Sequence, residues 1–407
     1  MNKEIYTNYA KLVIKYGINL QKGQDVIVYS STRAIEFARY IVEEAYHAGA
    51  ARVRVDINDE KIDYLTYKYE DEKVLDTVLE YEEAKSKYRA EKLPCLVYIS
   101  DEDPDAFNGL DVNKITNVRA ARYKVIKKYR DLEDNNNQWV IISVPSPSWA
   151  KKMFPNDSEE VAMQKLWEAI IHTTRLEGDA IANWDQHVNY LAEKAAKLNA
   201  LNLDYLKYSS SNGTDLTLKL QPNHEWISAR EVNLKGIGFI ANMPTEEVFT
   251  MPKRDGVDGV VYSTKPLSLN GQLVEDFKVT FEKGKCVDVD ARVGKDTLVS
   301  MLDMDESSRH LGEVALVPYN SPINETGLLF YNTLFDENAC CHLAFGQAFK
   351  NNIRGYEKMS EEDFQKAGFN DSVNHVDFMI GSKDLSIVGY DHEGQAHQIF
   401  KDGVWAL

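Results

Sequence analysis

The first half of the chain alternates short apolar runs of β type with stretches whose apolar residues recur at helical spacing. The β-type runs are "DVIVY" (25–29), "ARVRVDI" (51–57), "CLVYI" (95–99) and "WVIISV" (139–144). Between the first two runs, Ile35, Ala38 and Ile41 follow the helical period, and Gly49 provides a stop. Strands separated by helices predict crossover connections and a mostly parallel sheet. No G-x-G-x-x-G follows the first run, so this half is interpreted as scaffold.

Two longer helices are predicted next. The first has Asp157 as its N-cap with Glu160 three residues later, ahead of an apolar face. The second begins at Asp179. His187 lies at core-facing spacing on the second helix, and we interpret it as a structural histidine rather than a metal ligand.

From about residue 205 the pattern becomes that of an antiparallel β protein. "DLTLKL" (215–220) and "GVVYST" (259–264) predict strands, and "FKVTFEKGKCVDVDA" predicts a hairpin with Lys283 and Gly284 in its turn. The C-terminal residues predict further hairpins that turn near Gly394 and Gly403. One helix, from Ser360 to Gly368, is expected to interrupt them.

These patterns predict two domains in a chain of 407 residues. The first, residues 1–200, is an α/β scaffold domain with a mostly parallel sheet. The second, residues 201–407, is a β-rich, antiparallel α+β domain. All the candidate chemistry described below falls in the second domain, which is therefore the expected catalytic domain.

The chain is acidic, with a formal net charge of −17. Such a charge repels phosphate backbones and anionic lipids, so we expect no nucleic-acid partner and no membrane partner. The four cysteines show no metal-knuckle spacing, and two of them, Cys340 and Cys341, are adjacent, which is a poor arrangement for an unstrained disulfide. Reduced cysteines, a start without a continuous apolar signal region and the lack of a long apolar span predict a cytoplasmic location.

The stretch "VNHVDFMIG" (373–381) places His375 and Asp377 two residues apart in an apolar run. In an extended strand, residues i and i+2 point to the same face, so both side chains enter one pocket. Burying such groups is costly unless they pair or bind a metal. An ordinary hydrogen bond at a strand end is the alternative, and other ligand-type residues nearby decide between the two.

Several other carboxylates and imidazoles are embedded in apolar sequence in the second half. "NMPTEEVFTMP" (242–252) holds two adjacent glutamates, of which at most one faces a shared pocket, because neighbouring side chains of a strand diverge. "LGEVALVP" (311–318) places a lone glutamate in a strand, and "FDENACCHLAFGQAF" (335–349) has a histidine followed by small residues suited to a tight turn. The candidates are Glu246, Glu247, Glu313, Asp336, Glu337 and His342, besides His375 and Asp377. Taken singly, they also fit a solvated pair, a strand-end charge and a helix-packing histidine.

A shared pocket for these groups would need cations. Buried carboxylates repel one another and raise one another's pKa values unless a cation compensates. Three glutamates, one aspartate and two histidines would carry about four negative charges, which two divalent cations balance. Oxygen and imidazole ligands suit zinc, cobalt or manganese. Two such ions about 3.5–4 Å apart activate a water for hydrolysis, so the pattern favours a hydrolase.

Five blocks of the sequence resemble those of the aminopeptidase T/aminopeptidase S (PepS) family of bacterial metallo-aminopeptidases. The blocks are "NMPTEEVFTMP", "STKPLSLNG", "LGEVALVP", "NTLFDENACCHLAFGQAF" and "HVDFMIGS". The resemblance runs from "YAKLVIKYGINLQKGQDVIV" to the end of the chain with matching spacing. It implies a cytoplasmic, often dimeric exopeptidase that uses two divalent metal ions to remove N-terminal residues from peptides with a free N-terminus.

The resemblance also implies the metal ligands. They are Glu247, Glu313, His342, His375 and Asp377, with Glu337 as a sixth. Glu313 would bridge the two ions, and Glu246 would not be a ligand. For a two-metal aminopeptidase we expect Glu313 or Glu337 to shuttle the proton. The family has a tyrosine seven residues after the histidine of the fourth block, where this chain has Phe349. A phenyl ring cannot donate a hydrogen bond to an oxyanion, and one lost donor costs about 3 kcal/mol of transition-state stabilisation.

The sequence therefore predicts a two-metal aminopeptidase that hydrolyses the first peptide bond with a metal-activated water, and a homodimer. Two other functions stay open. One is a metal-stabilised binding or scaffold protein whose catalysis is weakened at Phe349. The other is a different metal-dependent amidohydrolase, which would share the site and differ in its substrate.

Overall fold

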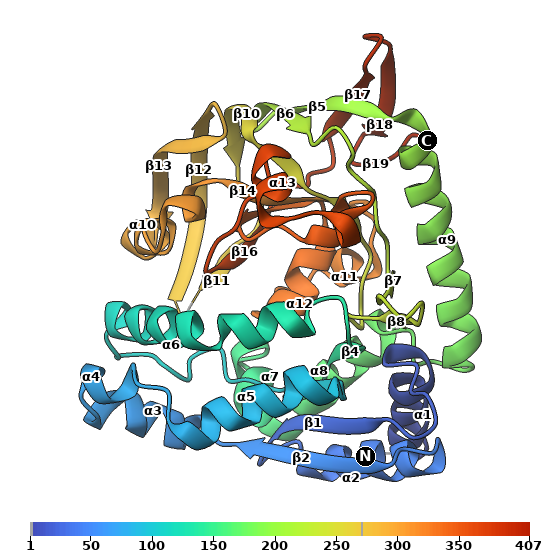
Figure 1. Cartoon of the computed structure of the whole chain (residues 1–407), viewed down its shortest axis with the longest axis vertical. Coiled ribbons are helices and arrows are strands. Elements are labelled where there is room, and N and C mark those ends of the chain that lie inside the picture. The colour runs from blue at the N-terminus through green and yellow to red at the C-terminus, as the bar shows by residue number, and fades with distance from the viewer. Residues whose placement is uncertain (1–2, 270–271) are drawn as a thin grey trace. The chain divides into compact units, whose positions relative to one another are not determined.

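The structure is a computed structural model of the chain and describes residues 3–269 and 272–407 (Figure 1). The last two residues of the block "STKPLSLNG", Asn270 and Gly271, lie outside the described residues. The chain divides into two compact units. Unit 1 comprises Met1–Val188 and Ala229–Thr245, and unit 2 comprises Asn189–Ser228 and Glu246–Leu407. The division into domains 1–200 and 201–407 stays a prediction, and each unit is described by itself.

Unit 1 is built on a four-stranded parallel sheet with the order β2-β1-β3-β4. The strands are β1 (Asp25–Ser31), β2 (Arg52–Asn58), β3 (Cys95–Ser100) and β4 (Trp139–Ser143). Each coincides with a predicted β run to within two residues at either end. The strands are joined through helices, as in crossover units, and the parallel sheet predicted for the first half is confirmed.

The helices of unit 1 precede, connect and follow these strands along the chain (Figure 1). They are α1 (Lys3–Leu12), η1 (Val13–Gly17), α2 (Ile35–His47), α3 (Glu60–Tyr69), α4 (Glu72–Leu75), α5 (Glu80–Lys92), α6 (Val112–Glu133), α7 (Pro147–Met153) and α8 (Glu159–Thr173). The N-cap of α8 is Ser158, whose side chain accepts a hydrogen bond from the Val161 backbone, so the prediction of Asp157 as the cap is wrong by one residue. Ser158 is the N-cap because its hydroxyl accepts a hydrogen bond from the third N–H of the helix, as N-cap side chains do.

The next helix, α9 (Ala180–Leu201), begins where the sequence predicts, and the Asp179 carboxylate accepts a hydrogen bond from the Ala182 backbone. His187 is buried on this helix, and its Nε2 lies 2.7 Å from the carbonyl oxygen of Thr245. It therefore serves a structural hydrogen bond, as predicted. A short hairpin, β7 (Arg230–Val232) with β8 (Gly238–Ile240), completes unit 1.

Unit 2 contains a large antiparallel sheet with the order β11-β12-β10-β6-β5-β17-β18-β19, in which β13 also pairs with β12. Its strands are β5 (Leu203–Ser209), β6 (Asp215–Leu220), β10 (Pro252–Tyr262), β11 (Leu267–Leu269), β12 (Gln272–Glu282), β13 (Lys285–Val293), β17 (Ser386–Asp391), β18 (Ala396–Lys401) and β19 (Val404–Trp405). The predicted hairpin turn between β12 and β13 forms at Lys283 and Gly284, which both have positive φ. Positive φ at both central residues matches the twist of antiparallel strands.

A second, smaller antiparallel sheet of unit 2 has the order β16-β15-β14-β9. Its strands are β9 (Val248–Thr250), β14 (Leu311–Leu316), β15 (His342–Gly346) and β16 (His375–Met379). Residues 342–346 form the buried strand β15, so the small residues that follow His342 begin inside a strand, which ends at Gly346 with its positive φ. The small residues there let neighbouring chains approach closely: a Cβ at Gly346 would lie 2.2 Å from the Asn374 carbonyl oxygen.

Short helices connect the strands of unit 2. They are α10 (Lys295–Leu302), η2 (Glu306–Arg309), α11 (Pro322–Glu325), α12 (Thr333–Asp336), η3 (Glu337–Ala339), η4 (Lys350–Asn352), η5 (Tyr356–Lys358) and α13 (Glu361–Lys366). The α13 helix has Ser360 as a capping-box N-cap, and Gly368 follows it with positive φ, so its predicted ends are confirmed.

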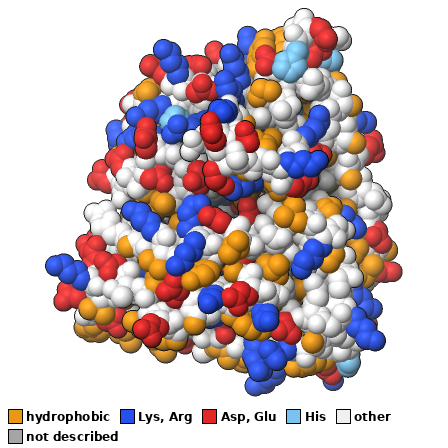
Figure 2. Space-filling model, viewed as in Figure 1, with side chains coloured by type: hydrophobic (Ala, Val, Ile, Leu, Met, Phe, Trp, Pro, Cys, Tyr) orange, Lys and Arg blue, Asp and Glu red, His pale blue; other side chains and the backbone are white. Residues whose placement is uncertain are grey.

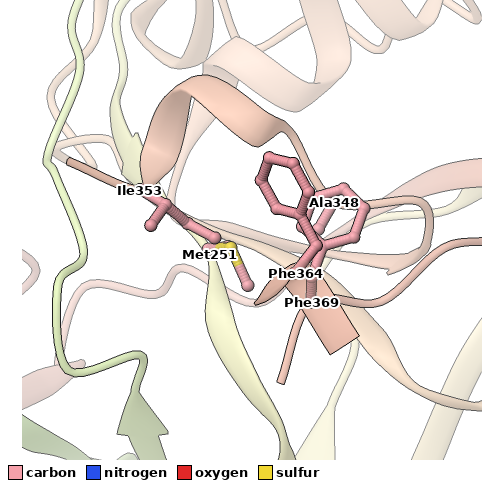
Figure 3. Packing of buried hydrophobic residues seen from close by; sticks show 5 residues of the cluster. All are labelled: Met251, Ala348, Ile353, Phe364 and Phe369. Atoms are coloured by element: carbon pink, nitrogen blue, oxygen red, sulfur yellow. The ribbon is translucent and has the colours of Figure 1, made fainter. Parts of the chain in front are cut away.

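A small apolar core holds the end of β9 and the segment after β15 in unit 2 (Figure 3). Its buried members are Met251, Ala348, Ile353, Phe364 and Phe369. Phe364 and Phe369 contact each other with ring centroids 5.3 Å apart. Two members of this core, Ala348 and Ile353, lie on either side of Phe349 in the sequence. Their burial therefore fixes the backbone that follows β15.

The predicted fold class is confirmed: the molecule combines a parallel, helix-connected sheet with antiparallel sheets. Among the described residues, no helix is long and apolar enough to cross a membrane. On the face that Figure 2 shows, acidic and basic side chains are interspersed.

Candidate metal centre

The small sheet of unit 2 places the candidate side chains on one face. Glu313 of β14 pairs with Ala344 of β15, which in turn pairs with Asp377 of β16. Directly opposed residues share a face of a sheet, so Glu313 and Asp377 point to the same side. Ala344 between them carries only a methyl group, which leaves the space above it to the longer side chains.

The same periodicity adds the remaining candidates. His342 lies two residues before Ala344, and His375 lies two residues before Asp377, so both imidazoles point to this face. Phe249 of β9 pairs with Ala315 of β14. Glu247 lies two residues before Phe249, and Glu313 lies two residues before Ala315, so each shares a face with its strand partner. The side chain of Glu247 is therefore directed to the same face, and that of Glu246 is not.

The side chains meet in two groups that share Glu313. In the first group, His342 Nε2 lies 3.1 Å from Glu247 Oε2 and 3.5 Å from Glu313 Oε1. In the second, His375 Nε2 lies 3.5 Å from Glu313 Oε2 and 3.4 Å from Asp377 Oδ1. Within each group the ligand atoms lie within 4.8 Å of one another. Glu313 thus offers a different oxygen to each group.

Hydrogen bonds of both imidazoles leave the Nε2 atoms for ligands. His342 Nδ1 lies 3.3 Å from the Cys340 carbonyl oxygen, and His375 Nδ1 lies 2.7 Å from the Gln347 carbonyl oxygen. A carbonyl oxygen only accepts, so each Nδ1 carries the proton that it donates. The neutral imidazole then has its lone pair on Nε2, directed at the carboxylates, which is the arrangement of metal-binding histidines. The donor set therefore fits divalent cations.

The carboxylates of the site have perturbed pKa values. Burial raises the pKa of Glu313 to about 7, and the negative charge of Glu247 adds to the shift, while the hydrogen bond to His342 opposes it. The pKa of Glu337 is raised well above its usual value by burial and then by the charges of Asp377 and Glu247. Without a cation, these groups compete for protons, because like charges cannot all ionise at close range.

The histidines compensate part of this charge in the protein alone. Burial lowers the pKa of His375, but the charge of Asp377 and its hydrogen bond raise it to about 9. The pKa of Asp377 is lowered: burial opposes ionisation, and the charge of His375 and its hydrogen bond outweigh burial. Without cations, these shifts favour a proton on His375 that it shares in a hydrogen bond with Asp377.

Glu337 comes from η3 and lies outside the two groups of ligand atoms found among the described residues. Its carboxyl group is hydrogen-bonded to Asp377 and to the side chain of Asn338. Glu246 is buried, and its backbone N–H donates to Asn338 Oδ1. Asp336 is also buried, and its two carboxylate oxygens accept hydrogen bonds from the Phe330 and Asn332 backbones. Its carboxylate therefore stabilises the loop before α12 and does not point to the candidate metal centre.

Phe349 lies against the second group. Its ring centroid is 4.9 Å from that of His375 and 6.1 Å from that of Phe249, and the residue is 36% exposed. The ring therefore covers one side of the His375 imidazole with an apolar surface.

Sequence reasoning missed two residues that orient the candidates, Gln347 and Asn338. Gln347 acts through its backbone carbonyl, which any residue type could supply, so no sequence signal marks it. Asn338 directly follows Glu337 and is fully buried. A buried amide beside a predicted ligand is a weak signal that would have pointed to it.

A buried sheet face on which carboxylates and imidazoles gather around a shared glutamate is typical of metal-dependent hydrolases. A family model described as thermophilic metalloprotease (M29) matches residues 2–405 of the chain. The chain belongs to this M29 metalloprotease family, whose membership implies the use of divalent metal.

Individual relatives agree with the family assignment. The chain is 44% identical over 401 residues to "Aminopeptidase AmpS" of Bacillus subtilis (strain 168), which covers 98% of this chain and 98% of that protein. It is 39% identical over 402 residues to "Aminopeptidase T" of Thermus thermophilus, which covers 98% of this chain and 97% of that protein. The solved structure "Wild-type AmpT from Thermus thermophilus" matches with a TM-score of 0.91 at 37% identity and covers 100% of both chains. The predicted family and the enzyme class, a metallo-aminopeptidase, are confirmed.

Proposed function

We propose that the protein is a two-metal aminopeptidase that releases the N-terminal residue of peptides by attack of a metal-activated water on the first peptide bond. The observation that carries the proposal is the position of Glu313, whose two carboxylate oxygens lie against two different histidines. A carboxylate shared in this way is suited to bridging two ions.

The proposed ligands of one ion are Glu247, Glu313 and His342, and those of the other are Glu313, His375 and Asp377. Glu337 is proposed as a further ligand through its proximity to Asp377. The mixed oxygen and imidazole donors suit zinc, cobalt or manganese. The chemistry that two such ions supply when bound is polarisation of the peptide carbonyl and activation of the attacking water.

The protein's own side chains are proposed to move the proton and select the substrate. Glu313 or Glu337 takes the proton that the water loses and gives it to the leaving amine, so that no net charge is created. The buried carboxylates attract the ammonium group of a free N-terminus, which an N-acetylated peptide lacks. Peptides with a free N-terminus are therefore the proposed substrates.

The test is hydrolysis of aminoacyl-nitroanilides by the metal-loaded protein, with N-acetylated analogues as controls. We expect turnover of the free amines only, and two metal ions per chain by elemental analysis. The variants Glu313→Ala and His375→Ala should lose metal and activity together. No turnover of any substrate contradicts the proposed function, whereas equal turnover of the N-acetylated analogues indicates another metal-dependent amidohydrolase.

A second candidate, a metal-stabilised scaffold protein with weakened catalysis, is favoured by one observation. Phe349 presents an apolar ring, with no hydrogen-bond donor, to the His375 side of the site. Restoring a donor with Phe349→Tyr separates the two functions. A gain of about 100-fold or more from a near-zero baseline supports the scaffold. A change of less than about 10-fold on an active enzyme supports the aminopeptidase.

We further propose a cytoplasmic location and a homodimer. The four cysteines are free and buried, which fits a reducing compartment. The homodimer follows from the family resemblance, and the molecular mass in solution tests it.

A further inference from the structure

We infer that Asn338 is a positioning residue that fixes Glu337 and the segment leading to Glu247 relative to each other beside the metal centre. This inference rests on the proposed function. The Asn338 side chain belongs to neither of the two groups of ligand atoms. It is hydrogen-bonded to the Glu337 carboxyl group and to the backbone of Glu246, the residue before Glu247.

The segment that carries Asn338 is held rigidly. Asn332 caps α12 by accepting a hydrogen bond from the Leu334 backbone. The Asp336 carboxylate accepts from the Phe330 backbone at 2.8 Å, which closes the loop before the helix. At the other end, the Ser321 hydroxyl donates to the Ala339 carbonyl at 2.8 Å. Asn338 therefore projects from a framework that does not depend on the metal ligands.

The Asn338 amide uses both of its polar atoms. Its Oδ1 accepts a hydrogen bond of 2.8 Å from the backbone N–H of Glu246, which lies 92 residues away in sequence. Its Nδ2 donates to the Leu334 carbonyl at 3.0 Å and to Glu337 Oε1 at 3.3 Å. The side chain is fully buried, so each bond replaces a contact with water that burial has removed.

These contacts determine two positions at once. The bond from Nδ2 restricts the rotation of the Glu337 carboxyl group, which also contacts Asp377. The bond to Oδ1 holds the backbone N–H of Glu246, the residue immediately before Glu247, whose carboxylate lies 3.1 Å from His342. One amide therefore ties together two carboxylates that come from distant parts of the sequence.

An amide is the group that this position requires. Aspartate would keep an acceptor for the Glu246 N–H but would lose the donor and place another negative charge beside Glu337. Alanine would leave the Glu246 N–H and the Glu337 carboxyl group without these partners. Groups that orient metal ligands typically contribute about 10–100-fold to metal affinity or activity.

Asn199 provides a matched control. It also bonds main-chain atoms of another segment in unit 2, because its Nδ2 donates to the Trp226 carbonyl at 2.9 Å and its Oδ1 accepts from the Trp226 N–H at 2.9 Å. The variant Asn199→Ala removes these two hydrogen bonds and the one that Oδ1 accepts from Arg354 at 3.1 Å, without touching the segments that carry the candidate ligands. It reports the cost of losing a structural amide alone.

The experiment compares the wild-type protein with Asn338→Ala, Asn338→Asp and Asn199→Ala. Metal affinity is measured by competition with a chromogenic chelator, the Co²⁺-loaded protein is examined by visible absorption, and kcat and KM are measured separately. We expect both Asn338 variants to lose about 10–100-fold in metal affinity or kcat and to shift the Co²⁺ absorption bands. Asn199→Ala should match the wild type in all three readouts, although its free energy of unfolding falls.

Two outcomes overturn the inference, and they are distinguishable. If the wild type binds metal and hydrolyses aminoacyl-nitroanilides while a folded Asn338 variant behaves like Asn199→Ala, Asn338 has only a structural role. If the wild type itself binds no metal, the proposed function fails, and the inference fails with it. Should Asn338→Ala not fold, Asn338→Asp decides alone, because it keeps an acceptor for the Glu246 N–H and loses the donor to Leu334 and Glu337.

Discussion

The Nε2 atom of His375 lies 3.5 Å from Oε2 of Glu313, the carboxylate oxygen that is not directed at His342. This relationship follows from the register of the small sheet, in which Glu313 and Asp377 both oppose Ala344. A central carboxylate flanked by one imidazole on each side links the two groups of ligand atoms. Changes at Glu313 should therefore affect both groups, whereas changes at the outer proposed ligands should affect one.

The first prediction concerns this central carboxylate. Glu313→Gln keeps the size of the side chain but removes the charge that is shared between the two groups. We expect it to lower the metal content from the proposed two ions to fewer than one per chain and to lower kcat by at least about 1000-fold, measured on the same preparation. Asp377→Asn, which changes an outer proposed ligand, should retain about one ion. A Glu313→Gln protein with full metal content would contradict the shared role.

The second prediction separates two adjacent glutamates. Glu247 lies against His342, whereas the Glu246 side chain points away from the ligand face. We expect Glu247→Gln to weaken metal binding by about 100-fold or more and Glu246→Gln to change it by less than about 5-fold. Chelator competition on the two purified variants measures this. Equal losses would mean that the local strand direction does not determine which glutamate serves the site.

Much of this arrangement could be predicted from sequence, because periodicity is local. The i, i+2 spacing of His375 and Asp377 correctly places both side chains on one face. Strand pairing is not local. The sequence around Glu313 does not indicate that Ala344 will be its partner in the sheet. The small residues after His342 show the same limit. Small residues fit a turn in isolation, but here they let strands approach closely, as Gly346 does beside Asn374.

The third prediction concerns metal removal. The buried carboxylates compete for protons without cations, as the raised pKa of Glu313, about 7, indicates, so binding of cations should stabilise the folded unit. At a free metal concentration of about 1000 times Kd, one bound ion adds about 4 kcal/mol to the free energy of unfolding. We expect a chelator to lower Tm, measured by calorimetry, and added metal to restore it. In Glu313→Ala the chelator should have little effect on Tm.

The fourth prediction concerns the apolar core of Figure 3. Phe364 is 4% exposed and contacts Phe369 in this core. Phe364→Ala should lower the free energy of unfolding by about 3–5 kcal/mol, because it removes a buried ring and leaves a cavity. Phe364→Leu should cost less, since it refills part of the space. Urea denaturation measures both, and a loss below about 1 kcal/mol for the alanine variant would show that the site collapses freely.

The fifth prediction concerns a histidine in unit 2 that is not among the candidate ligands. His224 is 2% exposed, its Nδ1 lies 2.8 Å from the Gln221 carbonyl oxygen, and its Nε2 is buried with no hydrogen-bond partner among the described residues. Burial lowers the pKa of His224 to about 4, against the opposing effect of the Gln221 bond. The folded protein therefore holds this imidazole neutral at a pH where the unfolded chain is already protonated.

The sign of the resulting pH dependence follows from that difference. Between pH 6.5, the usual pKa of histidine, and about 4, the unfolded state binds a proton that the folded state does not, so the free energy of unfolding falls as the pH falls. The full loss is about 3 kcal/mol, and it ends below pH 4 because both states are then protonated. His224→Phe should remove this contribution and flatten the curve, whereas His47→Gln, at an exposed position, should not. Measuring all three proteins with chelator present cancels the protonation of the metal site in the comparison. Parallel curves for the wild type and His224→Phe between pH 6.5 and 4 would show that burial of this imidazole does not set the acid stability.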